Sequence, residues 1–104
     1  MEKRIERRRQ YSIDLLYGSN DTYSPGTACN ISLHGMLIHA ENKIVPINHE
    51  IKVLMTIDGE IVSLLGIVCW NSEILDLKPE ADKCLGVFIP DPHPEYIKYL
   101  GRLN

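Results

Sequence analysis

Residues 51–70 read IKVLMTIDGEIVSLLGIVCW and contain the clearest structural signal in this chain of 104 residues. Apolar and polar side chains alternate over the first seven positions, which is typical of a β-strand with one buried face. Asp58 and Gly59 follow, and residues 60–70 are again rich in branched apolar side chains. An Asp-Gly pair between two such runs favours a two-residue type I′ turn, so the stretch predicts a β-hairpin. The face that we expect to be buried in its first strand consists of Ile51, Val53, Met55 and Ile57.

Shorter strand signals lie on both sides of this hairpin. Turn-forming residues and prolines separate them, and the second half of the hairpin is followed by a polar loop. If five to seven short antiparallel strands close into a barrel, no edge strand is left with unpaired backbone groups, so we predict an all-β barrel. We expect further strands at residues 11–17, 27–32, 36–40 and 85–89, with breaks at 18–21, 24–26, 42–49 and 75–83.

The C-terminal tail changes from a two-residue period to a helical one. Residues 91–94, Asp-Pro-His-Pro, offer a cap and an early proline, both of which suit a helix start. Apolar side chains then recur at positions i, i+3, i+4 and i+7, which predicts a short amphipathic helix within residues 91–103. We expect its apolar stripe to pack on the barrel or to plug one end, and the stripe consists of Tyr96, Tyr99, Leu100 and Leu103.

The charge of the chain is divided unevenly. Residues 1–9 carry five basic and two acidic side chains, so the total of −3 leaves −6 for the remainder. A basic arm on an acidic body is unsuited to DNA or RNA, which usually need a basic face across the domain. It suits a small anionic ligand, an acidic partner or a solvated tail. We therefore expect a flexible basic arm over residues 1–10 and one folded domain over residues 11–104.

Several classes of function are disfavoured by the sequence. It contains no run of 18 apolar residues and no signal-peptide centre, so we expect a cytoplasmic protein without membrane insertion. Its scattered histidines argue against a metal site, and no motif pairs a nucleophile with a base, so we expect no cofactor and no enzymatic activity. Cys29, Cys69 and Cys84 have apolar neighbours, and we expect three reduced, buried thiols.

Two local motifs could carry a binding function. Arg7, Arg8 and Arg9 directly precede the first predicted strand, and taken alone they would be a solvated tail. Residues 30–35 read NISLHG at the end of another strand. Taken alone, this segment would be an ordinary turn, in which Asn and Ser bond nearby backbone groups and Gly accepts a positive φ.

Together the two motifs resemble those of the PilZ family, whose members are bacterial receptor domains for cyclic di-GMP. That family pairs an RxxxR motif before the first strand with a [D/N]xSxxG motif at a strand turn, and Asn30, Ser32 and Gly35 match the second motif in full. Residues 66–70, GIVCW, and residues 85–89, LGVFI, resemble two later strands of the family. The resemblance implies a six-stranded, split β-barrel with a C-terminal α-helix.

The arginine motif can be aligned in two ways. Arg4 and Arg8 match RxxxR literally. In the alternative, residues 6–9 (ERRR) match the family's segment, Arg8 is the first motif arginine, and Ser12 stands in place of the second. Sheet alternation favours this alternative, because it fixes the register of the strand more firmly than a charged arm does. One ligand-binding arginine would then be missing.

The resemblance also implies roles for individual residues. Guanidinium groups can meet phosphate or the O6 and N7 acceptors of guanine in bidentate fashion, and they can stack on a base. By the resemblance, the arm wraps cyclic di-GMP against the barrel, Asn30 bonds a guanine edge, Ser32 bonds a base or phosphate, and Gly35 permits the sharp turn. Further candidates are Arg4, Ser12, His34 and Trp70, and Trp70 is either a stacking platform or a core or rim residue.

Three functions remain in competition. The first is a cyclic di-GMP receptor, a monomer or dimer, that orders its arm on binding and signals to an unidentified effector protein. The second is a PilZ-like barrel that has lost the ligand and acts as a protein-interaction module, which Ser12 favours. The third is a small RNA-binding barrel, against which the acidic body and the lack of interleaved surface aromatics argue.

Overall fold

The computed structural model describes residues 9–40, 44–72 and 83–103, with the backbone alone for residues 9–11. Six strands are followed by one helix in this part of the chain. Their bounds are β1 (Arg9–Ser19), β2 (Thr22–Ser32), β3 (Gly35–Ala40), β4 (Glu50–Ile57), β5 (Glu60–Asn71), β6 (Lys83–Phe88) and α1 (Pro94–Leu103).

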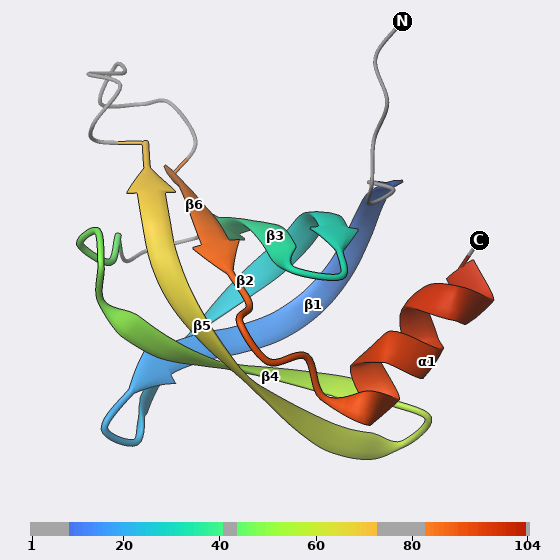
Figure 1. The fold of residues 1–104 in the computed structure, drawn as a ribbon. Helices are drawn as coiled ribbons and strands as arrows, with labels where there is room; N and C mark the ends of the chain where they lie inside the picture. The colour runs from blue at the N-terminus through green and yellow to red at the C-terminus, as the bar shows by residue number, and fades with distance from the viewer. Residues whose placement is uncertain (1–8, 41–43, 73–82, 104) are drawn as a thin grey trace, which may run out of the picture.

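The strands form a closed barrel in the order β1-β2-β3-β6-β5-β4 (Figure 1). Every neighbouring pair is antiparallel. The ring closes where β1 meets β4, with Leu16 opposite Leu54 and Gly18 opposite Lys52. The prediction of a six-stranded antiparallel barrel with a C-terminal helix is therefore confirmed.

Two tight hairpins have the backbone that their sequences favour. Asp58 and Gly59 have φ values of 53° and 81° and join β4 to β5, as predicted. Asn20 and Asp21, with φ values of 53° and 63°, join β1 to β2 in the same way. Positive φ at both central residues is the requirement of a type I′ turn, whose twist matches that of the flanking strands.

The predicted break at residues 24–26 is wrong, because β2 runs through it. Pro25 lies opposite Leu16 of β1 but beyond the end of β3, whose last residue, Ala40, pairs with Gly26. A proline is tolerated where a strand has a neighbour on one side only. A Cβ at Gly26 would press on the ring of Tyr17, so the glycine makes room for a core aromatic rather than for a turn.

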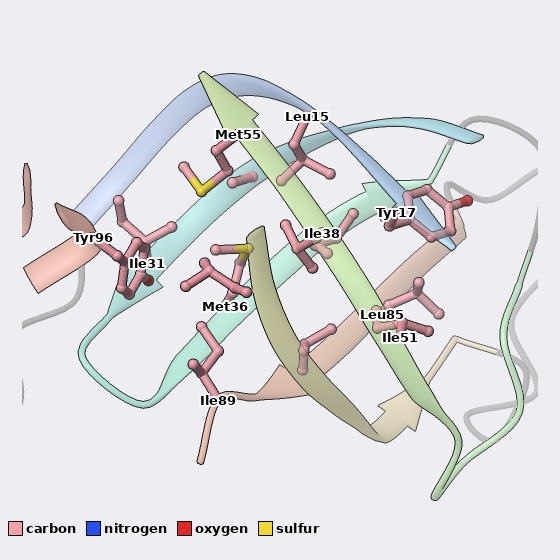
Figure 2. Close-up of a cluster of buried hydrophobic side chains, with 14 of the residues drawn as sticks. Leu15, Tyr17, Ile31, Met36, Ile38, Ile51, Met55, Leu85, Ile89 and Tyr96 are labelled. Carbon is pink, nitrogen blue, oxygen red and sulfur yellow. The ribbon is translucent and has the colours of Figure 1, made fainter. Parts of the chain in front are cut away.

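The inward faces of the strands form one apolar core (Figure 2). All four residues predicted to share the buried face of β4 are buried, as are Leu15 and Tyr17 of β1. The core also includes Ala28 and Ile31 of β2, Met36 and Ile38 of β3, Leu64 and Val68 of β5, and Leu85 and Val87 of β6. The period-two pattern of the sequence therefore corresponds to the inside and outside of the barrel.

Helix α1 begins at Pro94, and His93 caps it. The ring Nδ1 of His93 accepts a hydrogen bond from the backbone N–H of Glu95 at 3.0 Å, and its carbonyl accepts the bond from Ile97. This satisfies amide groups that the first helical turn leaves without a partner. Helix α1 has ten residues and is too short to cross a membrane. The described part of the chain contains no other helix.

Two contacts attach α1 to the barrel in addition to its apolar stripe. Tyr96 is fully buried, and its phenol donates a hydrogen bond to the carbonyl of Ser32 at 2.8 Å. Arg102 forms an exposed ion pair with Asp58 at 2.8 Å, and the hydrogen bond from this pair raises the pKa of Arg102. Tyr99, Leu100 and Leu103 pack against the core as predicted. The helix thus lies between the end of β2 and the β4–β5 turn.

Candidate functional site

The first residues of β1 lie beside the NISLHG segment. Arg9 is opposite Ile31 and Gln10 is opposite Asn30 in the antiparallel ladder of β1 and β2. The strand begins at Arg9, two residues before the predicted start. Arg4, Arg7 and Arg8 lie outside the described residues. The backbone pairing nevertheless brings the end of the basic segment against the strand that carries the second motif.

Two irregularities in the ladders determine which way Asn30 faces. The register shifts on β1 between Gln10 and Ile13, and on β2 between Ala28 and Asn30. An extra residue in one strand interrupts the simple alternation of side chains. Ala28 and Ile31 are consequently both buried, and Asn30 is half-buried on the outer face. Sequence alternation alone does not predict this placement.

Asn30 belongs to a transverse row on the outside of the barrel. Its partner on β3 is Leu37, the partner of Leu37 on β6 is Gly86, and the partner of Gly86 on β5 is Trp70. The row therefore runs from Gln10 through Asn30, Leu37 and Gly86 to Trp70 across five strands. Neighbouring strands are about 4.8 Å apart, so roughly 10 Å separates the backbones at Asn30 and Gly86.

Trp70 lies on the outer surface and is 37% exposed. Its indole occupies the space that a side chain at position 86 would need, because a Cβ there would collide with the indole nitrogen Nε1. The indole therefore lies against the backbone of β6, in line with Asn30. This result favours the rim interpretation of Trp70 over the core interpretation, and it leaves part of the ring open to solvent.

The turn of the second motif is closed by contacts within the protein. The side chain of Ser32 is only 2% exposed, and its hydroxyl donates a hydrogen bond to the carbonyl of Gly35 at 3.4 Å. Leu33 and His34 form the turn, and Gly35 is the first residue of β3, opposite Ser32 and Phe88. Gly35 has no positive φ, whereas Gly59 does, so the expected left-handed glycine is absent at this described turn.

His34 joins this turn to the end of β6. Its Nδ1 lies 2.8 Å from the carbonyl oxygen of Ile89, and since a carbonyl accepts, Nδ1 carries the proton. The carbonyl of His34 in turn accepts a bond from the N–H of Ile89 at 3.0 Å. The imidazole also stacks on Phe88 with 6.2 Å between ring centroids. The contacts of His34 are therefore largely structural.

Ser12 is exposed on β1, next to the irregularity that precedes Ile13. Its side chain thus faces solvent. Ser12 lies on the same strand as Gln10, two residues further along the chain. A longer side chain at this position would meet no steric obstacle from the barrel interior. An arginine, which the favoured alignment of the motif has at this position, would therefore be accommodated.

The expectation of three buried cysteines is wrong. Cys69 is exposed, and Cys29 and Cys84 are half-buried, all three as free thiols. The reason is a register shift between Val68 and Trp70, which turns Cys69 out of the core. Its Sγ donates to the carbonyl of Gly86 at 3.2 Å. Among the described residues, His, Cys, Asp and Glu form no group that could hold a metal ion.

Comparison with known proteins gives matches at the level of structure. No family model and no curated protein matches this chain. The structure of the Bacillus subtilis inhibitor of motility (MotI/DgrA) is similar over 99% of this chain, with a TM-score of 0.70 and 11% sequence identity. An uncharacterized Legionella protein is similar over 93% of this chain and 92% of its own, with a TM-score of 0.52 and 15% identity.

The chain spans about half the length of the inhibitor of motility, of which it covers 51%. At 11% and 15% identity, the two likenesses show the fold alone. They agree with the six-stranded barrel and C-terminal helix of this chain, and they do so through structure rather than sequence.

Proposed function

We propose that this chain is a cyclic di-GMP receptor domain of the PilZ type, which acts by binding rather than by catalysis. The observation that carries the proposal is the pairing of Gln10 with Asn30. Because the two motifs are adjacent in the sheet, residues just before Arg9 can reach a ligand held at Asn30. Two motifs on opposite sides of the barrel could not form one site.

The row from Asn30 to Trp70 suggests how the ligand would lie. The Asn30 amide has both a donor and an acceptor for a guanine edge. The exposed part of the Trp70 indole offers a face on which a base can stack, and such stacking contributes about 1–3 kcal/mol per base. The indole covers Gly86, so Leu37 is the row position left between it and Asn30, and a flat base would lie there beside the indole.

The row of Asn30 offers no positive charge, so the negative charge of the ligand requires basic side chains from another part of the chain. The chain outside residues 1–9 has a net charge of −6, which repels a dianion. The arginines of the basic segment would therefore supply the attraction, and guanidinium groups bind phosphate and guanine in bidentate fashion. Ordering of this segment on binding would change the surface that an effector protein meets in the cytoplasm.

Isothermal titration calorimetry with cyclic di-GMP tests the proposal directly. We expect wild-type protein to bind, and we expect Arg8→Ala to weaken binding by about 5- to 150-fold, since a bidentate arginine contributes roughly 1–3 kcal/mol. Lys3→Ala removes one positive charge from the same segment and serves as the matched control, for which a much smaller change is expected. Equal losses in both variants would mean that the segment acts only as diffuse charge.

A second candidate is a barrel that no longer binds the ligand and works as a protein-interaction module. Two observations favour it: the hydroxyl of Ser32 is buried against the carbonyl of Gly35, and Ser12 stands in place of a motif arginine. Calorimetry separates the candidates, because this one predicts no heat of binding for cyclic di-GMP at any concentration.

A further inference from the structure

We infer that the outer face of β1, β4 and β5 is an interface between two copies of this chain. This face carries three of the large apolar side chains that are exposed on the barrel: Leu16, Ile61 and Leu65 are 43%, 73% and 43% exposed. The face uses other positions of β1 and β5 than Gln10 and Trp70, which belong to the row of Asn30, so the inference does not depend on the proposed ligand. We define the β1–β4–β5 face by its nine outward residues: Asp14, Leu16, Gly18, Lys52, Leu54, Thr56, Ile61, Ser63 and Leu65.

Strand register arranges these nine residues in three rows. The middle row is Leu16, Leu54 and Ser63, which are successive ladder partners. On one side lies the row of Gly18, Lys52 and Leu65, which are also successive partners. The row on the other side consists of Asp14, Thr56 and Ile61, in which Thr56 pairs with Ile61.

A groove separates β1 from β4 in the row of Asp14. The ladder between these strands is recorded only from Leu16 to Gly18, and beyond it the strands diverge. The space has a volume of about 430 Å³ and is lined by apolar groups of Leu16, Leu54 and Ile61 and by the polar Asp14 and Thr56. It is large enough to accept an apolar side chain from outside.

The pattern of the face is complementary to itself. A two-fold axis that lies along the middle row, in the plane of the interface, exchanges the two outer rows. Ile61 of one copy, which lines the groove, then faces Leu65 of the second copy. Leu16 and Leu54 meet their own equivalents across the axis. An isologous contact of this kind is the commonest way in which soluble chains pair.

The charges on the face match under the same operation. Asp14 belongs to one outer row and Lys52 to the other, so the axis brings Asp14 within one strand spacing of Lys52 of the second copy. Within one copy, two steps of about 6.7 Å along the strands separate these residues, which is too far for direct contact. The axis therefore gives both charges an opposite partner in the second copy, and the pair of Asp14 and Lys52 occurs twice.

The size of the face sets the expected strength of the dimer. Its outermost backbone positions span about 10 Å by 13 Å. The area of such a face is well below the roughly 800 Å² per partner that a stable interface buries. We therefore expect a dimer that dissociates on dilution. Sedimentation velocity of the full chain over a wide range of concentrations should show a shift from monomer to dimer.

Charge exchange provides the decisive test. We expect Asp14→Lys and Lys52→Asp each to raise the dissociation constant by about tenfold, because each places like charges together. The double variant with both changes should dimerise like the wild type, since the exchanged charges again face opposite partners. Circular dichroism of each variant checks that the barrel is folded.

An apolar variant and its control complete the test. Ile61→Asp should abolish the dimer, whereas Ile97→Asp, at an exposed apolar residue of α1 outside the face, should leave it unchanged. A folded protein that is monomeric at every concentration would overturn the inference and assign the face to a different protein. A dimer that is insensitive to Ile61→Asp, or a charge exchange without rescue, would overturn it as well.

Discussion

The phenol of Tyr96 donates a hydrogen bond to the carbonyl of Ser32, 64 residues earlier in the chain. Through this bond the C-terminal helix is attached directly to the turn that carries the candidate ligand motif. Tyr96 is also fully buried and belongs to the same apolar core as Ile31 (Figure 2). The helix and the motif are therefore parts of one packing unit.

We predict that Tyr96→Phe lowers the free energy of unfolding by about 1–3 kcal/mol. The ring remains, but the buried carbonyl of Ser32 loses the phenol as a donor. Tyr96→Ala should cost about 3–5 kcal/mol, because it also leaves a cavity. Urea denaturation measures both changes, with the exposed Ile97→Ala as a control that changes stability by about 0.5 kcal/mol or less. A Phe variant as stable as the wild type would show that the bond contributes nothing.

We predict that Gly86→Ala displaces the Trp70 indole. The new Cβ would occupy the place of Nε1, at a cost of about 1–3 kcal/mol in stability. Because Trp70 is the single tryptophan of the chain, its fluorescence emission reports the displacement. If the proposed site is correct, binding of cyclic di-GMP should weaken as well.

Gly101→Ala is the matched control for this variant. Nothing lies within 4 Å of a Cβ at position 101, and the residue is helical, so alanine should stabilise the protein by up to about 1 kcal/mol. Unchanged emission and stability in Gly86→Ala would contradict the placement of the indole.

We predict that Ser12→Arg tightens binding of cyclic di-GMP by about 5- to 150-fold. The exposed position can hold the long side chain without strain, and it restores the second motif arginine of the favoured alignment. Ser19→Arg adds the same charge at an exposed position at the other end of β1, and there we expect little effect. Calorimetry on both variants gives the answer, and equal behaviour would count against that alignment.

We predict that Cys69 reacts with iodoacetamide before Cys29 and Cys84 do. Cys69 is exposed and the others are half-buried, and a thiol must be accessible to the reagent in order to react. Mass spectrometry of peptides after brief labelling of the native protein measures the order. Similar rates for all three thiols would contradict this prediction and would indicate that the barrel opens faster than the thiols react with iodoacetamide.

The local elements of the fold could be predicted from neighbouring residues. Alternation between Ile51 and Ile57 is a property of one strand, and the Asp58–Gly59 turn depends on the φ preferences of two residues. The helical stripe that begins at Tyr96 is equally local. These signals were sufficient for an antiparallel barrel with a terminal helix, since short strands joined by tight turns pair with their neighbours in sequence.

The motifs of the candidate site were also visible in the sequence, but their geometry was not. That Gln10 lies opposite Asn30, and that Asn30 shares a row with Trp70, depends on shifts of register at three points in the sheet. The exposure of Cys69 has the same origin. Pro25 predicts a break locally, and it is tolerated within β2 only because β3, a different strand, ends at Ala40.

The amino-acid sequence by itself determined which residues are extended, where the chain turns and which motifs it contains, because these depend on backbone preferences within a few residues. Tertiary structure alone decided which outward side chains become neighbours, because strand register and bulges are set by the partner strand. The row that ends at Trp70 and the self-complementary face around Leu16 and Leu54 both belong to this second class.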